Sequence, residues 1–227
     1  MSNTFFIVYV FALIFFGAGQ FTQMLLSTQG VILSMFIANC LFVIYMTYKA
    51  YKICDKNYDS NSIKVLFIYS LGIVIYASLS ILLFRQNMEN SWQEYDTLNV
   101  IMIFSLFIVL GIFTGRDNLK IISGAVVKGI PQTTFAVSIW FEGNLGVSME
   151  MIIAFHILTL PRCYQTYKIW KSHKSDKNKK AMFISEAVNE FTWTIVTIAF
   201  FSSGKSEDKS SLFFIVSLIP YIFPNPF

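Results

Sequence analysis

Three ionisable side chains lie inside apolar runs in the second half of the chain. Lys128, His156 and Glu190 each stand well within such a run, and Asn189 precedes Glu190. Charged groups are costly in the hydrocarbon core of a bilayer, so they usually face a bundle interior or a wet cavity. With a helical rise of about 1.5 Å per residue, we predict that the three meet near the bilayer midplane. Lys128 would form an ion pair with Glu190.

Two interpretations of this cluster stay open. In the first, the pair of Lys128 and Glu190 fixes the register of two helices, and His156 is hydrogen-bonded in the core. In the second, Glu190 and His156 belong to a substrate or proton pathway, because histidine titrates near neutral pH. Trp193 lies one turn beyond Asn189 on the same face, where it would either pack in the core or stack on a flat substrate.

The first half of the chain offers neutral polar candidates. Gln20 and Gln23 lie one turn apart and are the best pathway residues there. Asn39 lies near mid-depth of its apolar run, where either an interhelical hydrogen bond or a solute contact would satisfy its amide. The predicted substrate site comprises Gln20, Asn39, His156, Asn189, Glu190 and Trp193.

A proline interrupts the apolar run that contains Lys128. The stretch reads Lys128-Gly129-Ile130-Pro131-Gln132. Proline removes a backbone donor and collides with the preceding turn, so the helix must kink or open there. Opened backbone at membrane depth is tolerated only where it packs in protein or lines a wet cavity. We predict a hinge at Lys128, Gly129, Pro131 and Gln132; the alternative is a kinked helix with a structural role alone.

These residues require membrane-spanning helices to position them. Of the 227 residues, 55% are hydrophobic and 13% charged, whereas soluble domains carry about 25% charged residues. The apolar runs are continuous, which favours helices over a β-barrel. With about 20 residues per span, the predicted helices lie near 4–26, 31–52, 63–84, 97–115, 119–141, 147–169 and 184–202. The apolar segment 211–224 is either an eighth span or an interfacial segment.

Alternate connections between these helices are rich in lysine. The connection between 168 and 180 is the most basic, whereas the third connection carries Glu89, Glu94 and Asp96. Basic loops stay in the cytoplasm, so the pattern places the N-terminus there as well. We interpret the net charge of +4 as an orientation signal and expect no nucleic-acid partner. The chain is expected to be an integral protein of the plasma (inner) membrane, in contact with the lipid bilayer.

The residue patterns do not indicate a metal site, a disulfide or an enzyme active site. Cys40, Cys54 and Cys163 follow no metal-ligand or disulfide spacing. The sequence contains neither Gly-x-Ser-x-Gly nor His-Glu-x-x-His. We therefore expect no enzyme activity, no cofactor and no metal. Whether the chain forms a homo-oligomer stays open.

The chain contains an internal repeat. Residues 45–52 read YMTYKAYK and residues 164–171 read YQTYKIWK, with five of eight positions identical. Upstream, the Gly-Val pair at 30–31 matches the pair at 146–147. Further back, the Gly-Gln pair at 19–20 stands where Pro-Gln stands in the fifth predicted helix. Because the matches occur in the same order, we interpret them as a duplicated three-helix unit; a coincidence of membrane-interface composition is the alternative.

A duplicated unit of three helices predicts the architecture. Such a unit ends on the side opposite its start, so one linking helix lets the second unit insert parallel to the first. Parallel repeats place a substrate site between the halves, near the bilayer midplane. The predicted fold is an all-α membrane protein with a 3+1+3 layout. Its parts are the first repeat at 1–90, the linker helix at 91–118, the second repeat at 119–203 and an apolar tail at 204–227.

The layout and motifs resemble those of the PQ-loop and SWEET (MtN3/saliva) transporter superfamily. The motifs are the Pro-Gln pair at 131–132 and a following Gly-Val-Ser at 146–148, and the resemblance extends from about 4 to 202. It implies a small-solute carrier with Pro-Gln hinges and substrate-holding asparagines in the third and seventh helices. Asn189 matches the second of these, whereas the third helix at 63–84 contains no asparagine. The family places its N-terminus outside the cytoplasm, which is opposite to the lysine pattern.

Transport of a small polar solute by alternating access is the leading functional hypothesis. One alternative is a vitamin carrier of the nicotinamide-riboside type, which an aromatic cage around the substrate would favour. Another is a receptor or sorting protein on the same fold, which a closed and dry central cavity would favour.

Overall fold

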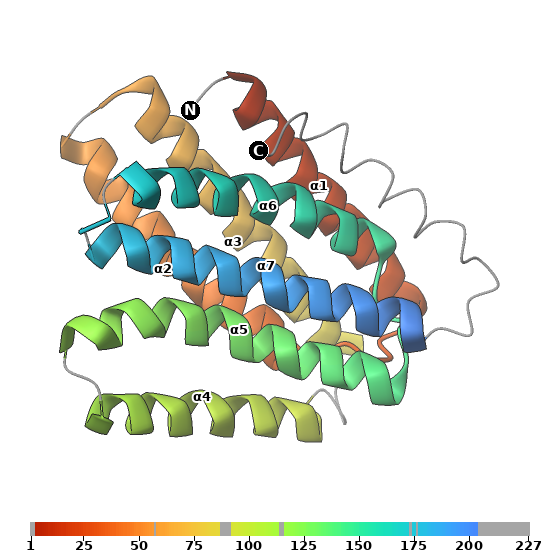
Figure 1. The fold of residues 1–227 in the computed structure, drawn as a ribbon. Helices are drawn as coiled ribbons and strands as arrows, with labels where there is room; N and C mark the ends of the chain where they lie inside the picture. Colours follow the sequence, from red (N-terminus) through yellow and green to blue (C-terminus); the bar gives the residue numbers. More distant parts are fainter. Residues whose placement is uncertain are drawn as a thin grey trace.

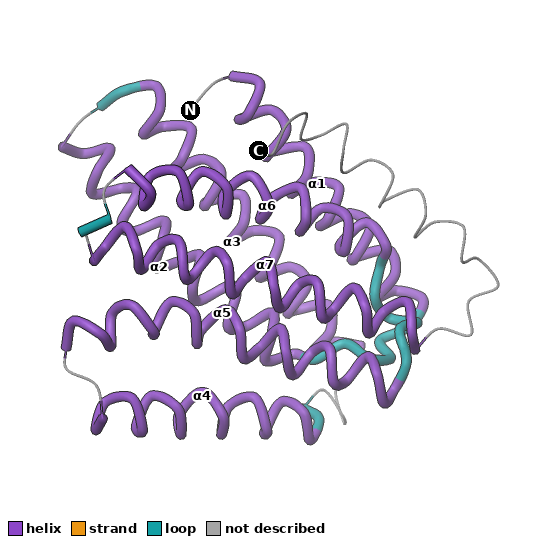
Figure 2. Tube along the Cα trace, in the orientation of Figure 1, coloured by secondary structure: helices purple, strands orange, loops and turns teal. Residues whose placement is uncertain are grey.

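The fold is entirely helical in the residues that the computed structural model describes, which are 3–56, 58–86, 92–113, 116–172, 174–175 and 177–203. Seven helices and no strand occur in these ranges (Figures 1 and 2). The helices are α1 (Asn3–Leu26), α2 (Leu33–Lys56), α3 (Ser60–Gln86), α4 (Glu94–Phe113), α5 (Arg116–Glu142), α6 (Met149–Ser172) and α7 (Lys177–Ser203). The prediction of an all-α chain is thus confirmed, and the predicted apolar tail lies outside the described residues.

Membrane association follows from the helices at the start of the chain. Within the described residues, three helical segments combine the length and the hydropathy of a membrane span: Asn3–Leu26, Leu33–Lys52 and Ser60–Gln86. A span of this kind needs about 20 mostly apolar residues. The chain therefore carries segments that belong in a bilayer.

The helices pack in two sets with the same internal order. In one set α3 lies against both α1 and α2, and in the other α7 lies against both α5 and α6. Between the sets, α1 packs against α6 and α2 packs against α5. Helix α4 lies at the edge of the bundle beside α5 and also contacts α2 (Figure 1).

A series of aromatic rings joins the two sets in the core. The ring centroid of Phe16 lies 5.5 Å from that of Tyr76 and 5.0 Å from that of Phe155. Phe155 in turn stacks on Trp193, with centroids 3.7 Å apart and planes inclined by 12°. Each such pair contributes about 0.5–1.5 kcal/mol beyond its buried area. Trp193 is fully buried in this packing.

Helix α5 continues on both sides of its proline. Pro131 is buried in the helix, and the hydroxyl groups of Thr133 and Thr134 donate to the carbonyl oxygens of Gly129 and Ile130, at 2.8 and 3.0 Å. Since Pro131 has no N–H, the backbone hydrogen bond that it would donate is missing from this turn. This turn of α5 therefore has one backbone hydrogen bond fewer than a regular helical turn, and it lies beside the cavity described next.

Candidate functional site

A cavity of about 100 Å³ lies between the two sets of helices. Helices α1, α2, α3, α5, α6 and α7 all contribute to its wall, and no described residue of α4 does. Its polar lining includes Tyr9, Asn39, Lys128, Gln132, Arg162 and Asn189. Four of the sequence-predicted residues, Asn39, Lys128, Gln132 and Asn189, therefore share this cavity.

Two cations of the wall bind one carboxylate. Lys128 Nζ lies 2.8 Å and Arg162 Nη2 lies 3.0 Å from the same oxygen, Oε1, of Glu186. Glu186 and Lys128 are buried, with 5% and 8% of their surface exposed, while about a third of the Arg162 side chain is exposed. The cluster ties α5, α6 and α7 together.

The predicted pairing of Lys128 with Glu190 is wrong, because Lys128 pairs with Glu186. Helices α5 and α7 run in the same direction along the bundle. Side chains on a helix lean toward its N-terminus, so the long Lys128 side chain reaches the carboxylate one turn before Glu190. Arg162 of α6 also turns to Glu186.

Glu190 forms a second polar group behind the cavity wall. His156 Nδ1 lies 2.8 Å from Glu190 Oε1, and His156 Nε2 lies 2.8 Å from the hydroxyl oxygen of Thr197. The Thr159 hydroxyl also donates to Glu190 Oε2. Of these four residues only Thr159 lines the cavity. His156 and Glu190 thus lie together as expected, but between α6 and α7 and outside the lining.

The amide groups of the cavity are engaged in hydrogen bonds, either between α5 and α7 or within α2. Gln132 Nε2 donates to Asn189 Oδ1 at 2.7 Å, and the Thr192 hydroxyl donates to Gln132 Oε1. Asn39 Nδ2 donates to the carbonyl oxygen of Met35 in its own helix at 2.9 Å. The interhelical hydrogen bond considered for Asn39 is replaced by this local one, and its side chain still faces the cavity.

Gln20 lies outside the cavity and joins the two sets of helices. Its Nε2 donates to the carbonyl oxygen of Gly146 at 2.8 Å, and its Oε1 accepts from the backbone N–H of Ser148 at 2.9 Å. Gln23 Nε2 donates to the carbonyl oxygen of Leu145 at 2.5 Å. Both glutamines therefore bind the backbone that leads into α6, and Gln20 is fully buried there.

The two connections at this end of the bundle interlock, and we call this part of the molecule the loop end. It consists of the connections 27–32 and 143–148. The Gly146 N–H donates to the carbonyl oxygen of Gln29 at 2.9 Å. Gly30 has φ 78°, and a Cβ there would lie 2.0 Å from the carbonyl oxygen of Gly143. Only glycine fits this position, because other residues rarely adopt such a φ and would meet the opposing backbone.

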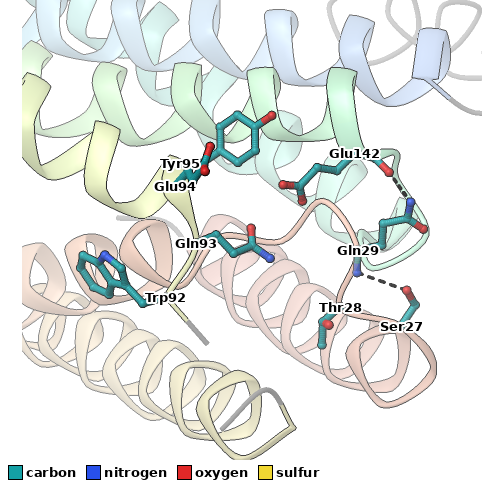
Figure 3. Close-up of a pocket in the computed structure, with 8 residues that line it drawn as sticks. All are labelled: Ser27, Thr28, Gln29, Trp92, Gln93, Glu94, Tyr95 and Glu142. Carbon is teal, nitrogen blue, oxygen red and sulfur yellow. Dashed lines mark hydrogen bonds between the residues drawn. The ribbon is translucent and has the colours of Figure 1, made fainter. Parts of the chain in front are cut away.

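A larger and more open hollow of about 830 Å³ lies on the outside of the loop end. Figure 3 shows its lining, in which Glu142 and Glu94 face the same space beside Gln29, Tyr95 and Trp92. Burial raises the pKa of the Glu142 carboxyl above its usual range. None of the sequence-predicted residues lines this hollow. The smaller cavity, where cations and amides converge between six helices, is therefore the candidate site.

The sequence interpretation missed Arg162 and Glu186 as members of the site. Both are charged residues in apolar runs, which was a usable signal, but each lies close enough to a run's end to suggest contact with water. Within the described residues, no group of three His, Cys, Asp or Glu side chains could hold a metal ion.

Comparison of the chain with protein-family models, with curated proteins and with solved structures gives no match in any of the three.

Proposed function

We propose that the protein is a membrane carrier for a small polar solute and works by alternating access between two three-helix units. The units are α1–α3 and α5–α7, with α4 as the linker, and all seven helices would span the bilayer. The observation that carries the proposal is the polar cavity between the units, to which all six of their helices contribute. Carriers built from parallel repeats hold their solute in this place.

The packing order supports the duplicated architecture. The third helix of each unit lies between the other two, and the contacts of α1 with α6 and of α2 with α5 are reciprocal. A pseudo-twofold axis between two like units produces such a pattern. The repeated Gly-Val pairs at 30–31 and 146–147 also lie in the two connections that interlock. The resemblance to the PQ-loop and SWEET superfamily points to the same architecture.

The predicted hinge residues lie at the cavity, where a bound solute would contact them. Lys128 and Gln132 face the cavity on either side of the turn that lacks the Pro131 hydrogen bond. A solute that binds these side chains would favour one bend of α5 over another, because a ligand shifts a conformational equilibrium by its differential affinity. At the loop end the units are already joined by backbone hydrogen bonds, so transport requires that this junction separate.

The size of the cavity favours one of two classes of solute. Five aromatic side chains line it, as a vitamin carrier of the nicotinamide-riboside type would require: Tyr9, Phe42, Tyr69, Tyr76 and Phe155. However, pockets for drug-sized ligands have typically about 300–1,000 Å³, whereas this cavity has about 100 Å³. A solute smaller than a nucleoside fits the arrangement better.

A reversible crosslink at the loop end tests alternating access. In a variant without native cysteines, Gln23→Cys and Leu145→Cys would be joined by a short bis-methanethiosulfonate reagent. The two side chains lie on opposite units, where Gln23 contacts the Leu145 carbonyl. In liposomes, counterflow of a solute found by thermal-shift screening of sugars, amino acids and organic acids should stop on crosslinking and return with reductant.

The matched control places a crosslink inside one unit. Phe6→Cys and Phe67→Cys join α1 to α3, where the two native rings lie 5.8 Å apart, and this link should leave counterflow unchanged. Undiminished counterflow in the crosslinked 23–145 variant would contradict alternating access. Solute binding without any counterflow in the uncrosslinked protein would support the receptor alternative instead.

A further inference from the structure

The charges on the cavity wall do not cancel. Lys128 and Arg162 both line the cavity, and no described acidic residue does. The carboxylate that pairs with them, Glu186, is a single negative charge shared by two positive ones through one oxygen. The next carboxylate, Glu190, has its oxygens engaged by His156 and Thr159 outside the lining. At the wall itself, two cations therefore share one carboxylate, while Glu190 and His156 form a separate pair behind it.

Of the two cations, Arg162 is better placed to bind an anion in the cavity. It gives one nitrogen to Glu186 at 3.0 Å and is hydrogen-bonded with Tyr9, and it lines the cavity with about a third of its side chain exposed. A guanidinium carries five N–H donors in a planar fork, which matches the two oxygens of a carboxylate. Lys128, in contrast, is buried against Glu186 and the Phe42 ring, whose centroid lies 5.4 Å from its Nζ. The fork of Arg162 thus supplies the specific contact and Lys128 supplies charge.

An uncompensated cation is costly at this depth. Removing a charge from water without a partner costs several kcal/mol in proteins, and the cost is highest in the hydrocarbon region of a bilayer. A monovalent anion in the cavity would balance the two cations and Glu186. A neutral solute would leave the excess charge in place.

The remaining lining limits the size and character of the anion. A volume of about 100 Å³ lies well below the roughly 300–1,000 Å³ of pockets for drug-sized ligands. Asn39 and Asn189 offer amide groups, and Tyr9 and Phe42 offer aromatic faces. A short carbon chain with a hydroxyl or carbonyl group would suit such a wall.

We propose that the solute is a small organic anion, a monocarboxylate of a few carbon atoms, whose carboxylate binds Arg162 and Lys128. This inference rests on the proposed carrier function, because it names the solute that the central cavity takes. It also predicts binding that can be measured without transport.

Binding to the purified full-length protein in detergent tests the inference with charge-matched probes. Lactate should raise the Tm and give a measurable Kd by calorimetry. Lactamide, which has nearly the same shape without the charge, should bind at least tenfold more weakly. Inorganic phosphate provides a second anion at the same ionic strength. Equal binding of lactate and lactamide would overturn the anion assignment, and so would binding of phosphate in place of lactate.

The matched variants lie on the same helix. Arg162→Gln leaves Lys128 and Glu186 as a balanced pair, so the protein should fold while its affinity for lactate falls at least tenfold. Arg162→Lys keeps the charge without the fork and should give an intermediate Kd. Lys168→Gln removes an exposed charge two turns away and should leave the Kd unchanged. Equal weakening by the Arg162 and Lys168 variants would assign the effect to net charge and overturn the site.

The two proposals fail in different ways. If lactate binds as expected and the crosslink at the loop end has no effect on counterflow, alternating access fails while the anion site stands. If a neutral solute is exchanged and the crosslink stops it, the carrier stands while the anion assignment fails.

Discussion

The two ends of the interface between α1–α3 and α5–α7 are held by different kinds of contact. At the loop end, backbone groups carry the junction: Gly146 donates to Gln29, and Gln20 binds the Gly146 carbonyl and the Ser148 amide. Toward the end where α1 begins, the described hydrogen bonds between the units come from Tyr9, whose hydroxyl donates to the carbonyl oxygen of Leu158 at 2.6 Å and is also hydrogen-bonded with Arg162.

This difference indicates which end of the interface separates more easily. A tyrosine hydroxyl can exchange its carbonyl partner for water by one side-chain rotation, whereas the loop end needs several hydrogen bonds to break together. Meanwhile the ion cluster near the cavity lies wholly within α5, α6 and α7. In a carrier, the cavity would therefore open first toward the end where α1 begins, and the loop end would be the slower gate.

The largest effect is expected at Gly30. Alanine there would hold an unfavourable positive φ and place its Cβ 2.0 Å from the Gly143 carbonyl oxygen. The strained backbone and the forced displacement together should cost about 4 kcal/mol. We expect Gly30→Ala to be recovered poorly and to unfold at a much lower Tm in detergent.

Gly17→Ala is the control for that substitution. Gly17 lies in α1, where a new Cβ would meet the Ile75 side chain at 3.1 Å and no opposing backbone. A flexible side chain can move by a few tenths of an ångström, and alanine favours helix, so the change should stay within about 1 kcal/mol. Similar losses of Tm at both positions would refute the special role of the loop end.

A smaller effect is expected at Glu186. Glu186→Gln leaves the cations Lys128 and Arg162 without their shared negative charge, two of the three groups being buried. Breaking a buried pair costs about 3–5 kcal/mol, and the partial exposure of Arg162 places this case near 3 kcal/mol. The Tm of the purified variant measures it. Because the cluster lies within one unit, the crosslink at 23–145 should not restore the lost stability.

A double-mutant cycle measures the coupling between Lys128 and Glu186. Adding Lys128→Met to Glu186→Gln removes one cation together with its partner, and the double variant should be more stable than Glu186→Gln alone. Additive losses would mean that Lys128 and Glu186 are not coupled.

The depth of each polar residue along its helix was predictable, but its partner was not. Residue spacing placed His156 and Glu190 at one level and Lys128 within reach of α7, and these groups do lie together. Which carboxylate Lys128 binds depends on how α5 and α7 are rotated about their axes and on the lean of the side chain. Packing sets both the rotation and the lean. Hydrophobic periodicity is too weak to predict the rotation in spans that are apolar on most faces.

The pair Gln20 and Gln132 illustrates the same limit. The repeat assigns them equivalent positions, and both are buried. Gln132 binds the side chains of Asn189 and Thr192 within its own unit, whereas Gln20 binds the backbone of the other unit. A glutamine side chain has both a hydrogen-bond donor and an acceptor. Its residue type therefore predicts that it forms hydrogen bonds in the core, but it does not predict which group it binds.

The smallest effect is expected at Asp59, in the connection before α3, which is held by local contacts. Asp59 Oδ1 accepts the backbone N–H of Ser62 at 2.7 Å and caps the helix. These hydrogen bonds to Ser62 hold the pKa of the Asp59 carboxyl below its usual range. Its contribution to stability is therefore present above the unfolded pKa of about 3.9 and is lost as the pH falls through the lower folded value.

Thermal unfolding between pH 7 and pH 3 checks this expectation. Asp59→Ala should lower the Tm slightly at pH 7, less than Glu186→Gln does, and the difference from the wild type should shrink toward pH 3. Asp59→Asn retains a capping oxygen and should stay near the wild type throughout. A loss at Asp59 as large as that at Gly30 would contradict the local role of this cap and the expected order of the effects.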